Sequence, residues 1–100
     1  MELKFRGEVV HWRGPAPFYF ITVPEAECEL LREESSFVSY GWGMIPVSGR
    51  LGRTTFTTAL WPREGLYVIP LKDAVRRPEN VELGDVVTVE LTIDLEKRRR

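Results

Sequence analysis

The sequence predicts a mainly β fold: a small closed or partly open β-barrel of six to seven strands, with one short α-helix and one helical turn. Three observations support this prediction. Several short segments alternate apolar and polar residues with the period of two that half-buried strands show. Gly and Pro separate these segments at close intervals, as in small barrels and sandwiches. One segment alone, residues 25–34, is rich in helix formers over about three turns.

The first strand is expected over residues 2–12, because Leu3, Phe5 and Val9 share one face and charged residues occupy the other. A turn rich in Gly and Pro at residues 13–17 ends this strand. Residues 18–23 are apolar and aromatic on both faces, so we expect a second strand that is buried on both sides.

The helix over residues 25–34 follows directly. Thr22 and Glu25 have the spacing of a capping box, and Pro24 suits a first helical turn. Cys28 lies between two glutamates on this acidic helix. Neighbouring negative charge raises the pKa of a thiol, so we interpret Cys28 as a small apolar residue and not as a nucleophile.

The second half of the chain contains the remaining strands and turns. We expect one or two strands over residues 37–51, with a Gly-rich bend at 40–43. A strand at 54–60, a hairpin loop at 61–65 and a strand at 66–71 should follow. The folded part of the chain should end with a helical turn at 72–77 that Pro78 stops, a tight turn at 83–85 and a long strand at 87–94.

Length and composition describe one ordinary globular domain, which we place at residues 1–95 with a charged tail at 96–100. The chain has 100 residues, of which 43% are hydrophobic and 29% charged, and its formal net charge is −1. No overall field therefore attracts nucleic acid or an anionic membrane. The single cysteine excludes an internal disulfide, and no signal segment or membrane span is apparent, so we expect a cytoplasmic protein with no membrane partner.

Metal, cofactor and catalytic chemistry have little support. His11 and Cys28 are the only residues of their types, whereas a zinc site needs three or four ligands, so we expect neither metal nor cofactor. No nucleophile-elbow pattern is present. The Gly-Asp pair ending at Asp85 is typical of a turn. A small hydrolase-like enzyme that uses Asp85, Glu90 or His11 with Lys72 is the least supported function, and we predict no catalytic residue.

The basic residues between positions 47 and 78 are more informative. They are Arg50, Arg53, Lys72, Arg76 and Arg77. Cations beside the aromatic side chains of Trp61 and Tyr67 have the chemistry to hold phosphates and stack on bases. Alternatively, they are solvated charges that pair with Glu64, Asp73 and Glu79.

Four sequence segments carry a resemblance to a known family. They are Thr57-Thr58-Ala59-Leu60-Trp61-Pro62, Tyr67-Val68-Ile69-Pro70-Leu71-Lys72, Ala74-Val75-Arg76-Arg77 and Gly84-Asp85-Val86-Val87-Thr88-Val89. Their order resembles the bacterial and archaeal family called domain of unknown function 1905. The resemblance implies a small β-barrel with a short helix and supplies no established activity. Thr58 and Trp61 stand where Ser and Phe are usual in the family.

Two functions remain as hypotheses beside the enzyme. The first is a non-enzymatic module that binds an anionic ligand, either a phosphate or carboxylate compound or nucleic acid. Its candidate binding residues are Thr57, Thr58, Lys72, Arg76, Arg77, Arg50 and Arg53. The second is a structural or protein-interaction domain, including a homodimer, that uses exposed tryptophans among Trp12, Trp42 and Trp61.

Overall fold

Six antiparallel strands close into a barrel, which confirms the predicted mainly β class. The computed structural model describes residues 2–12, 18–38 and 44–93, and the side chains within them except at positions 12, 18 and 34–38. The strands pair in the order β1-β2-β5-β4-β3-β6. The elements are β1 (Glu2–Trp12), β2 (Phe18–Thr22), α1 (Glu25–Val38), β3 (Ile45–Leu51), β4 (Thr54–Arg63), β5 (Leu66–Leu71), α2 (Asp73–Arg76) and β6 (Val86–Thr92).

Alternate residues of each strand fill the barrel interior, as the period of two predicts. On β1 the side chains of Phe5 and Val9 are buried, and on β6 those of Val89 and Leu91 are buried. Aliphatic side chains dominate the interior, and no charged or polar residue of the described chain is fully buried. The barrel therefore holds a packed apolar core, and most outward side chains of its strands are at least partly exposed.

Two long strands make the closure possible, because each changes its partner along its length. Residues 2–8 of β1 pair with β6, and residues 9–12 pair with β2. On β4, residues 54–60 pair with β3 and residues 61–63 pair with β5. The two halves of each strand thus belong to different walls of the barrel, as in sheets that turn a corner through a bend in one strand.

Gly7 lies at the bend of β1, where the strand passes very close to the end of β2. A Cβ atom at this position would lie 2.3 Å from the backbone oxygen of Thr22 and 2.7 Å from a side-chain methyl carbon of Ile21. Thr22 also exchanges hydrogen bonds with β1, since its hydroxyl donates to the backbone oxygen of Glu8 and accepts from the backbone nitrogen, both at 3.3 Å. Only glycine fits this approach.

Two tight hairpins join the strands around β4. Gly52 has φ +61 at the first central position of the turn between β3 and β4, as a type II′ turn requires. The turn between β4 and β5 has Glu64 at φ 51 and Gly65 at φ 82, and two positive φ values define type I′. Both turns match the right-handed twist of their strands.

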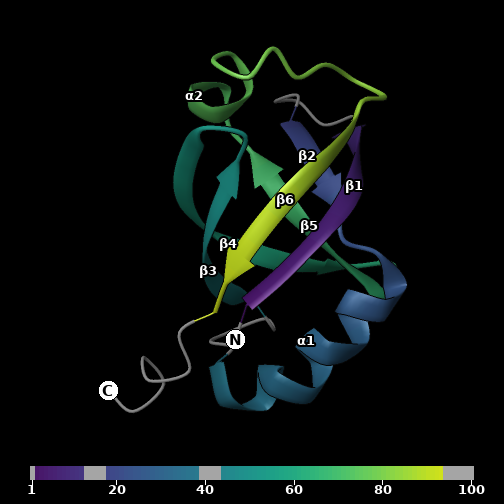
Figure 1. The fold of residues 1–100 in the computed structure, drawn as a ribbon. Coiled ribbons are helices and arrows are strands. Elements are labelled where there is room, and N and C mark those ends of the chain that lie inside the picture. The colour runs from purple at the N-terminus through teal and green to yellow at the C-terminus, as the bar shows by residue number, and fades with distance from the viewer. Residues whose placement is uncertain (1, 13–17, 39–43, 94–100) are drawn as a thin grey trace.

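The helices lie at opposite ends of the barrel, as Figure 1 shows. Leu31 and Cys28 from α1 and Val75 from α2 join the interior cluster. The thiol of Cys28 donates to the backbone oxygen of Val23 and accepts from the backbone nitrogen of Tyr67, and burial raises its pKa. The structural interpretation of Cys28 therefore agrees with its position. No helix in the described part of the chain is long and apolar enough to cross a membrane.

The helix α1 begins at Glu25 as predicted, but its N-cap and its end differ from the sequence prediction. The first helical hydrogen bond runs from the nitrogen of Cys28 to the oxygen of Pro24, so Pro24 is the N-cap. The proposed capping box was wrong, because the hydroxyl of Thr22 is already bonded to Glu8. The helix continues to Val38, four residues beyond its predicted end, since no Gly or Pro interrupts residues 25–38. The strand predicted from residue 37 consequently begins at Ile45.

Three prolines lie within strands, each at a point where the strand has one paired neighbour. Pro46 lies in the part of β3 that pairs with β4 but not with β6. Pro62 lies in the part of β4 that pairs with β5 only, and Pro70 in the part of β5 that pairs with β2 only. A missing N–H is tolerated at such positions. Residues 61–63, predicted as loop, are therefore strand.

Other boundaries agree with the predictions within two residues. The extents of β1 and β5 match, α2 occupies the predicted helical turn, and the turn before β6 has Gly84 at φ +89. The carboxylate of Asp85 accepts from the backbone nitrogen of Glu82 at 2.8 Å, which is the turn role predicted for it. The turn at 13–17, the bend at 40–43 and the charged tail at 96–100 lie outside the described residues, and the assignment of 1–95 to one domain stays a prediction.

Replacing Gly7 by alanine should lower the free energy of unfolding by about 3 kcal/mol or more, because the added methyl group collides with backbone that cannot move independently. Urea denaturation monitored by circular dichroism measures the change. Gly84→Ala is the matched control: its φ of +89 costs about 1–2 kcal/mol, but no atom lies within 4 Å of the new Cβ. A loss for Gly7→Ala no larger than that of Gly84→Ala would contradict the argument.

Candidate functional site

The structure distributes the predicted binding residues over three places. Arg50 and Thr57 lie on one outer face of the barrel, Arg53 lies in the turn between β3 and β4, and Lys72 and Arg76 line a groove beside α2. Thr58 and Arg77 lie in neither hollow. The seven residues therefore do not form one site.

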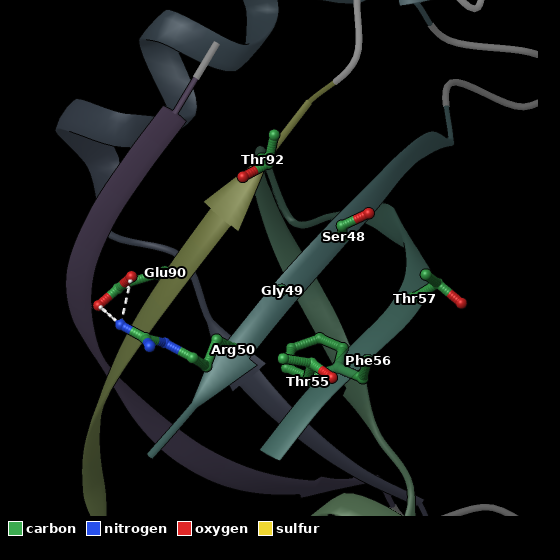
Figure 2. A pocket seen from close by; sticks show the side chains of 8 residues that line it. All are labelled: Ser48, Gly49, Arg50, Thr55, Phe56, Thr57, Glu90 and Thr92. Carbon is green, nitrogen blue, oxygen red and sulfur yellow. Dashed lines mark hydrogen bonds and ion pairs between the residues drawn. The ribbon is translucent and has the colours of Figure 1, made fainter. Parts of the chain in front are cut away.

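The first hollow, which we call the β3–β6 face, is broad and open, with a volume of about 530 Å³. Its lining residues are Ser48, Gly49, Arg50, Thr55, Phe56, Thr57, Glu90 and Thr92 (Figure 2). The guanidinium of Arg50 reaches across to β6, where its Nη2 donates to both carboxylate oxygens of Glu90 at 2.8 and 3.0 Å (Figure 2). Among the residues that line this face, the cation Arg50 is thus neutralised by the anion Glu90.

This ion pair sets the titration of Glu90. The hydrogen bond from Arg50 lowers the pKa of the carboxyl below its ordinary value of 4.5, and the charges of Arg50 and Lys4 act in the same direction. Desolvation raises the pKa; it is a smaller effect than the hydrogen bond but a larger one than either charge alone. Because both side chains are about half exposed, the pair contributes little to stability and serves mainly to fix the two side chains.

Thr58 and Arg53 are placed away from ligand-accessible hollows. Thr58 shares the face of β4 that carries fully buried Leu60, so its side chain points towards the core. At Arg53 the backbone nitrogen donates to the carboxylate of Glu79 at 3.3 Å, and the Thr54 hydroxyl donates to the same oxygen at 2.6 Å. Glu79, named as a possible charge partner, therefore ties the β3–β4 turn to the segment after α2.

The second hollow, which we call the α2 groove, has a volume of about 490 Å³. It is lined by Tyr19, Phe20, Trp61, Pro70, Leu71, Lys72, Asp73 and Arg76. The groove opens where β4 and β5 separate: their pairing ends at Trp61 and Val68, while β5 continues along β2 as far as Leu71. Its volume lies within the range of roughly 300–1,000 Å³ that small-molecule sites occupy.

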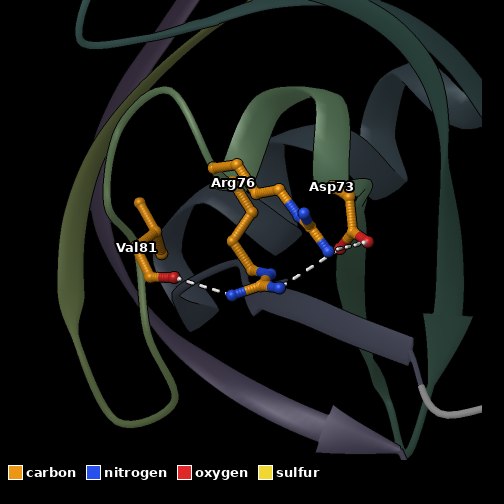
Figure 3. A network of polar contacts seen from close by, with 4 residues as sticks. Asp73, Arg76 and Val81 are labelled. Carbon is orange, nitrogen blue, oxygen red and sulfur yellow. Dashed lines mark hydrogen bonds and ion pairs between the residues drawn. The ribbon is translucent and has the colours of Figure 1, made fainter.

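Arg76 is the most constrained cation of the α2 groove. Its guanidinium carbon lies 4.5 Å above the centroid of the Tyr19 ring, a cation–π geometry. Its Nη1 donates to the backbone oxygen of Val81 at 3.4 Å and its Nη2 to the carboxylate of Asp73 at 3.3 Å, as Figure 3 shows. Its Nε is buried without an acceptor among the described residues. Arg76 is therefore fixed between the α2 turn and β2.

Asp73 serves two arginines at once. One carboxylate oxygen pairs with Arg76, and the other lies 3.6 Å from Nη2 of Arg77, which is largely exposed. Asp73, which was considered as a charge partner for the basic residues, thus uses both carboxylate oxygens in ion pairs. This agrees with the interpretation of Arg77 as a solvated, paired charge.

Lys72 differs from Arg50, Arg76 and Arg77, each of which forms an ion pair. It follows β5 directly, in extended backbone with φ −81 and ψ 155, and its side chain makes no capping hydrogen bond. It forms no ion pair with any residue that the structure describes. Because Leu71 faces the core, alternation places Lys72 on the same outer face as Pro70.

The aromatic lining of the groove was largely missed from the sequence. Tyr19 and Phe20 come from β2, and the sequence shows an apolar segment there but not which strand lies beside it. Trp61 was named and does line the groove, whereas Tyr67 is buried in the barrel interior and cannot stack on a ligand. The sequence did contain one indication of this groove: both faces of β2 are apolar, so its outward side chains must also pack against other residues.

The residues of the hypothetical hydrolase do not come together in the described structure. His11 packs against Tyr19 at 5.4 Å between ring centroids, Asp85 closes its own turn and Glu90 pairs with Arg50. No cluster of three or more His, Cys, Asp or Glu residues that could hold a metal occurs among the described residues.

These features define a small closed β-barrel with a mixed aromatic and cationic groove beside α2. Residues 5–91 match the family model described as Domain of unknown function (DUF1905), and the chain belongs to this family. The resemblance stated from the sequence is thereby confirmed. No curated protein matches the chain significantly.

Replacing Arg50 by glutamine should raise the pKa of Glu90 towards 4.5, because the hydrogen bond that lowers it is lost. NMR titration of the Glu90 carboxyl carbon measures this change. The wild-type carboxyl has a folded pKa below its unfolded value, so the pair stabilises the fold above about pH 4.5 and loses its effect as the pH falls through the folded pKa.

Arg53→Gln is the matched control, since this arginine lies in the adjacent turn and is not among the groups that shift the pKa of Glu90. It should leave the Glu90 titration unchanged. An Arg50→Gln protein whose Glu90 titrates as in the wild type would show that the pair is not formed in solution.

Proposed function

We propose that this domain binds a small anionic ligand in the α2 groove. The proposal rests on Lys72, which lines a cavity of about 490 Å³. This lysine has no ion-pair partner among the described residues. An uncompensated ammonium group beside apolar surface is a favourable place for a carboxylate or phosphate.

The local charge supports this choice. The segment 72–77 carries three cations and one anion, a net charge of +2, within a chain whose formal net charge is −1. Because Asp73 already pairs with two arginines, it does not neutralise Lys72. The segment is thus a local positive region at the end of β5, where the groove opens.

A small ligand fits the charges better than a nucleic acid polymer. Each neutralised phosphate of a duplex contributes a slope of about −0.9 to the salt dependence of binding, and strong binders use several such contacts. The α2 groove offers Lys72 and the already committed Arg76, and the cation of the β3–β6 face is paired with Glu90. We therefore place a single phosphate or carboxylate compound before nucleic acid.

Exposed apolar residues support a second candidate, a protein-interaction or homodimer role. Leu83 is 59% exposed and Val86 is 54% exposed, and both lie at the turn that begins β6. Sedimentation velocity over a range of concentrations tests self-association. A concentration-independent monomer would remove the homodimer.

The anion site predicts that Lys72→Gln weakens the binding of pyrophosphate and of simple carboxylates about tenfold or more, because a charge-assisted hydrogen bond is lost. Isothermal titration calorimetry at low salt measures the affinity, and amide shifts near residues 71–73 locate the site by NMR. Arg53→Gln removes the same charge from the β3–β4 turn and should leave binding unchanged.

Two results would overturn the proposal. One is the failure of phosphate, pyrophosphate and carboxylates to bind at low salt. The other is equal weakening by Lys72→Gln and Arg53→Gln, which would indicate a diffuse charge effect without a site at the groove.

A further inference from the structure

Trp61 is unusual among the aromatic residues of the described chain because it is both held in place and accessible. It is 39% exposed, whereas Phe20 beneath it is 2% exposed. The two rings lie 5.5 Å apart between centroids at an interplanar angle of 57°. Trp61 is also the strand partner of buried Val68. One side of the indole therefore covers an apolar surface and the remainder borders the α2 groove.

Phe20 and Val68 do not belong to the barrel interior, although both are buried. Phe20 is the strand partner of Pro70, and Val68 pairs with both Thr22 and Trp61. Alternation places these side chains on the outside of β2, β4 and β5, which lie side by side in Figure 1. They form a small outer apolar layer, and Trp61 is its accessible edge.

The two cations of the α2 groove differ in how their side chains are held: Arg76 is fixed by its neighbours and Lys72 is not. The side chain of Arg76 is only 21% exposed. Its Nη1 and Nη2 already donate to Val81 and Asp73, its Nε is buried, and its guanidinium covers the ring of Tyr19. Lys72 has no such commitments. An incoming anion would meet Lys72 without breaking an existing ion pair, whereas binding to Arg76 would displace Asp73.

We infer that the ligand of the α2 groove is a small planar aromatic anion, whose ring stacks on Trp61 and whose carboxylate or phosphate binds Lys72. The inference rests on the proposed anion site and adds the aromatic ring. Trp61 and Lys72 line the same groove, so one ligand can contact both. A flat ring gains stacking and apolar contact with the indole that a saturated ring of similar size gains only in part.

Three matched probes separate ring from charge: 2-naphthoate, its fully saturated analogue decahydronaphthalene-2-carboxylate, and neutral 2-naphthamide. We expect 2-naphthoate to bind about tenfold more tightly than either comparison compound, since each lacks one of the two contacts. Calorimetry gives the affinities, and the indole N–H resonance of Trp61 reports contact by NMR.

Trp61→Leu should abolish the preference for the aromatic anion over the saturated one and leave the saturated anion bound as before. Leu83→Ala removes an exposed apolar side chain outside the groove and should change neither affinity. Lys72→Gln should weaken both anions and leave the amide unaffected.

The outcomes distinguish the two proposals. Equal affinity for the aromatic and saturated anions, with dependence on Lys72, would overturn the aromatic inference and leave the anion site standing. Failure of both anions and of pyrophosphate to bind would overturn both. Tighter binding of oligothymidylate than of thymidine monophosphate, with a steep salt dependence, would replace the small molecule by single-stranded nucleic acid.

Discussion

The bend that lets β1 pair with two different strands is the constraint on which the rest of the barrel depends. Its first part completes the wall with β6 and its second part completes the wall with β2. The change of partner occurs where Gly7 passes against the backbone of Thr22, at a distance that no side chain allows. This approach sets how β1 meets β2, the strand that pairs with β5 and carries Tyr19 and Phe20 to the α2 groove.

The corresponding change of partner in β4 creates the groove itself. Strand β4 pairs with β3 before Trp61 and with β5 from Trp61 onward, so beyond Val68 the edge of β5 that faces β4 has no neighbouring strand among the described residues. The chain fills this opening with α2 and with the outer apolar layer under Trp61. The barrel needs a corner here in order to close. The same corner contains the α2 groove and its cation Lys72. The proposed site follows from the topology and needs no added loop or domain.

Sequence pattern predicted those features that depend on nearest neighbours. The alternation of Val87, Val89 and Leu91 indicated the last strand, and Gly84 with Asp85 indicated the turn before it. The end of α1 was not predictable, because nothing in residues 35–38 stops a helix and nothing requires it to continue. The Pro62 error has another cause: proline disfavours only strands with two paired neighbours, and the number of neighbours is a property of the whole fold.

The candidate site was predicted in part for the same reason. Lys72 and Arg76 attracted attention as cations near the end of a strand, and both line the groove. Arg50 looked equivalent in the sequence, yet it is neutralised by Glu90, forty positions away along the chain. Which cation finds an acid depends on strand register, and alternation along one strand carries no information about register between two.

The three strand prolines have a consequence for how this domain behaves among copies of itself. In the described structure, this barrel has short stretches of strand that pair with a strand on one side only, and an unpaired strand edge is a place where a second chain can add a strand. Pro46, Pro62 and Pro70 each lie in one of these stretches and cannot donate a backbone hydrogen bond. A second chain that added a strand at such a stretch would lack a hydrogen bond at the proline, which disfavours strand exchange and edge-to-edge aggregation there.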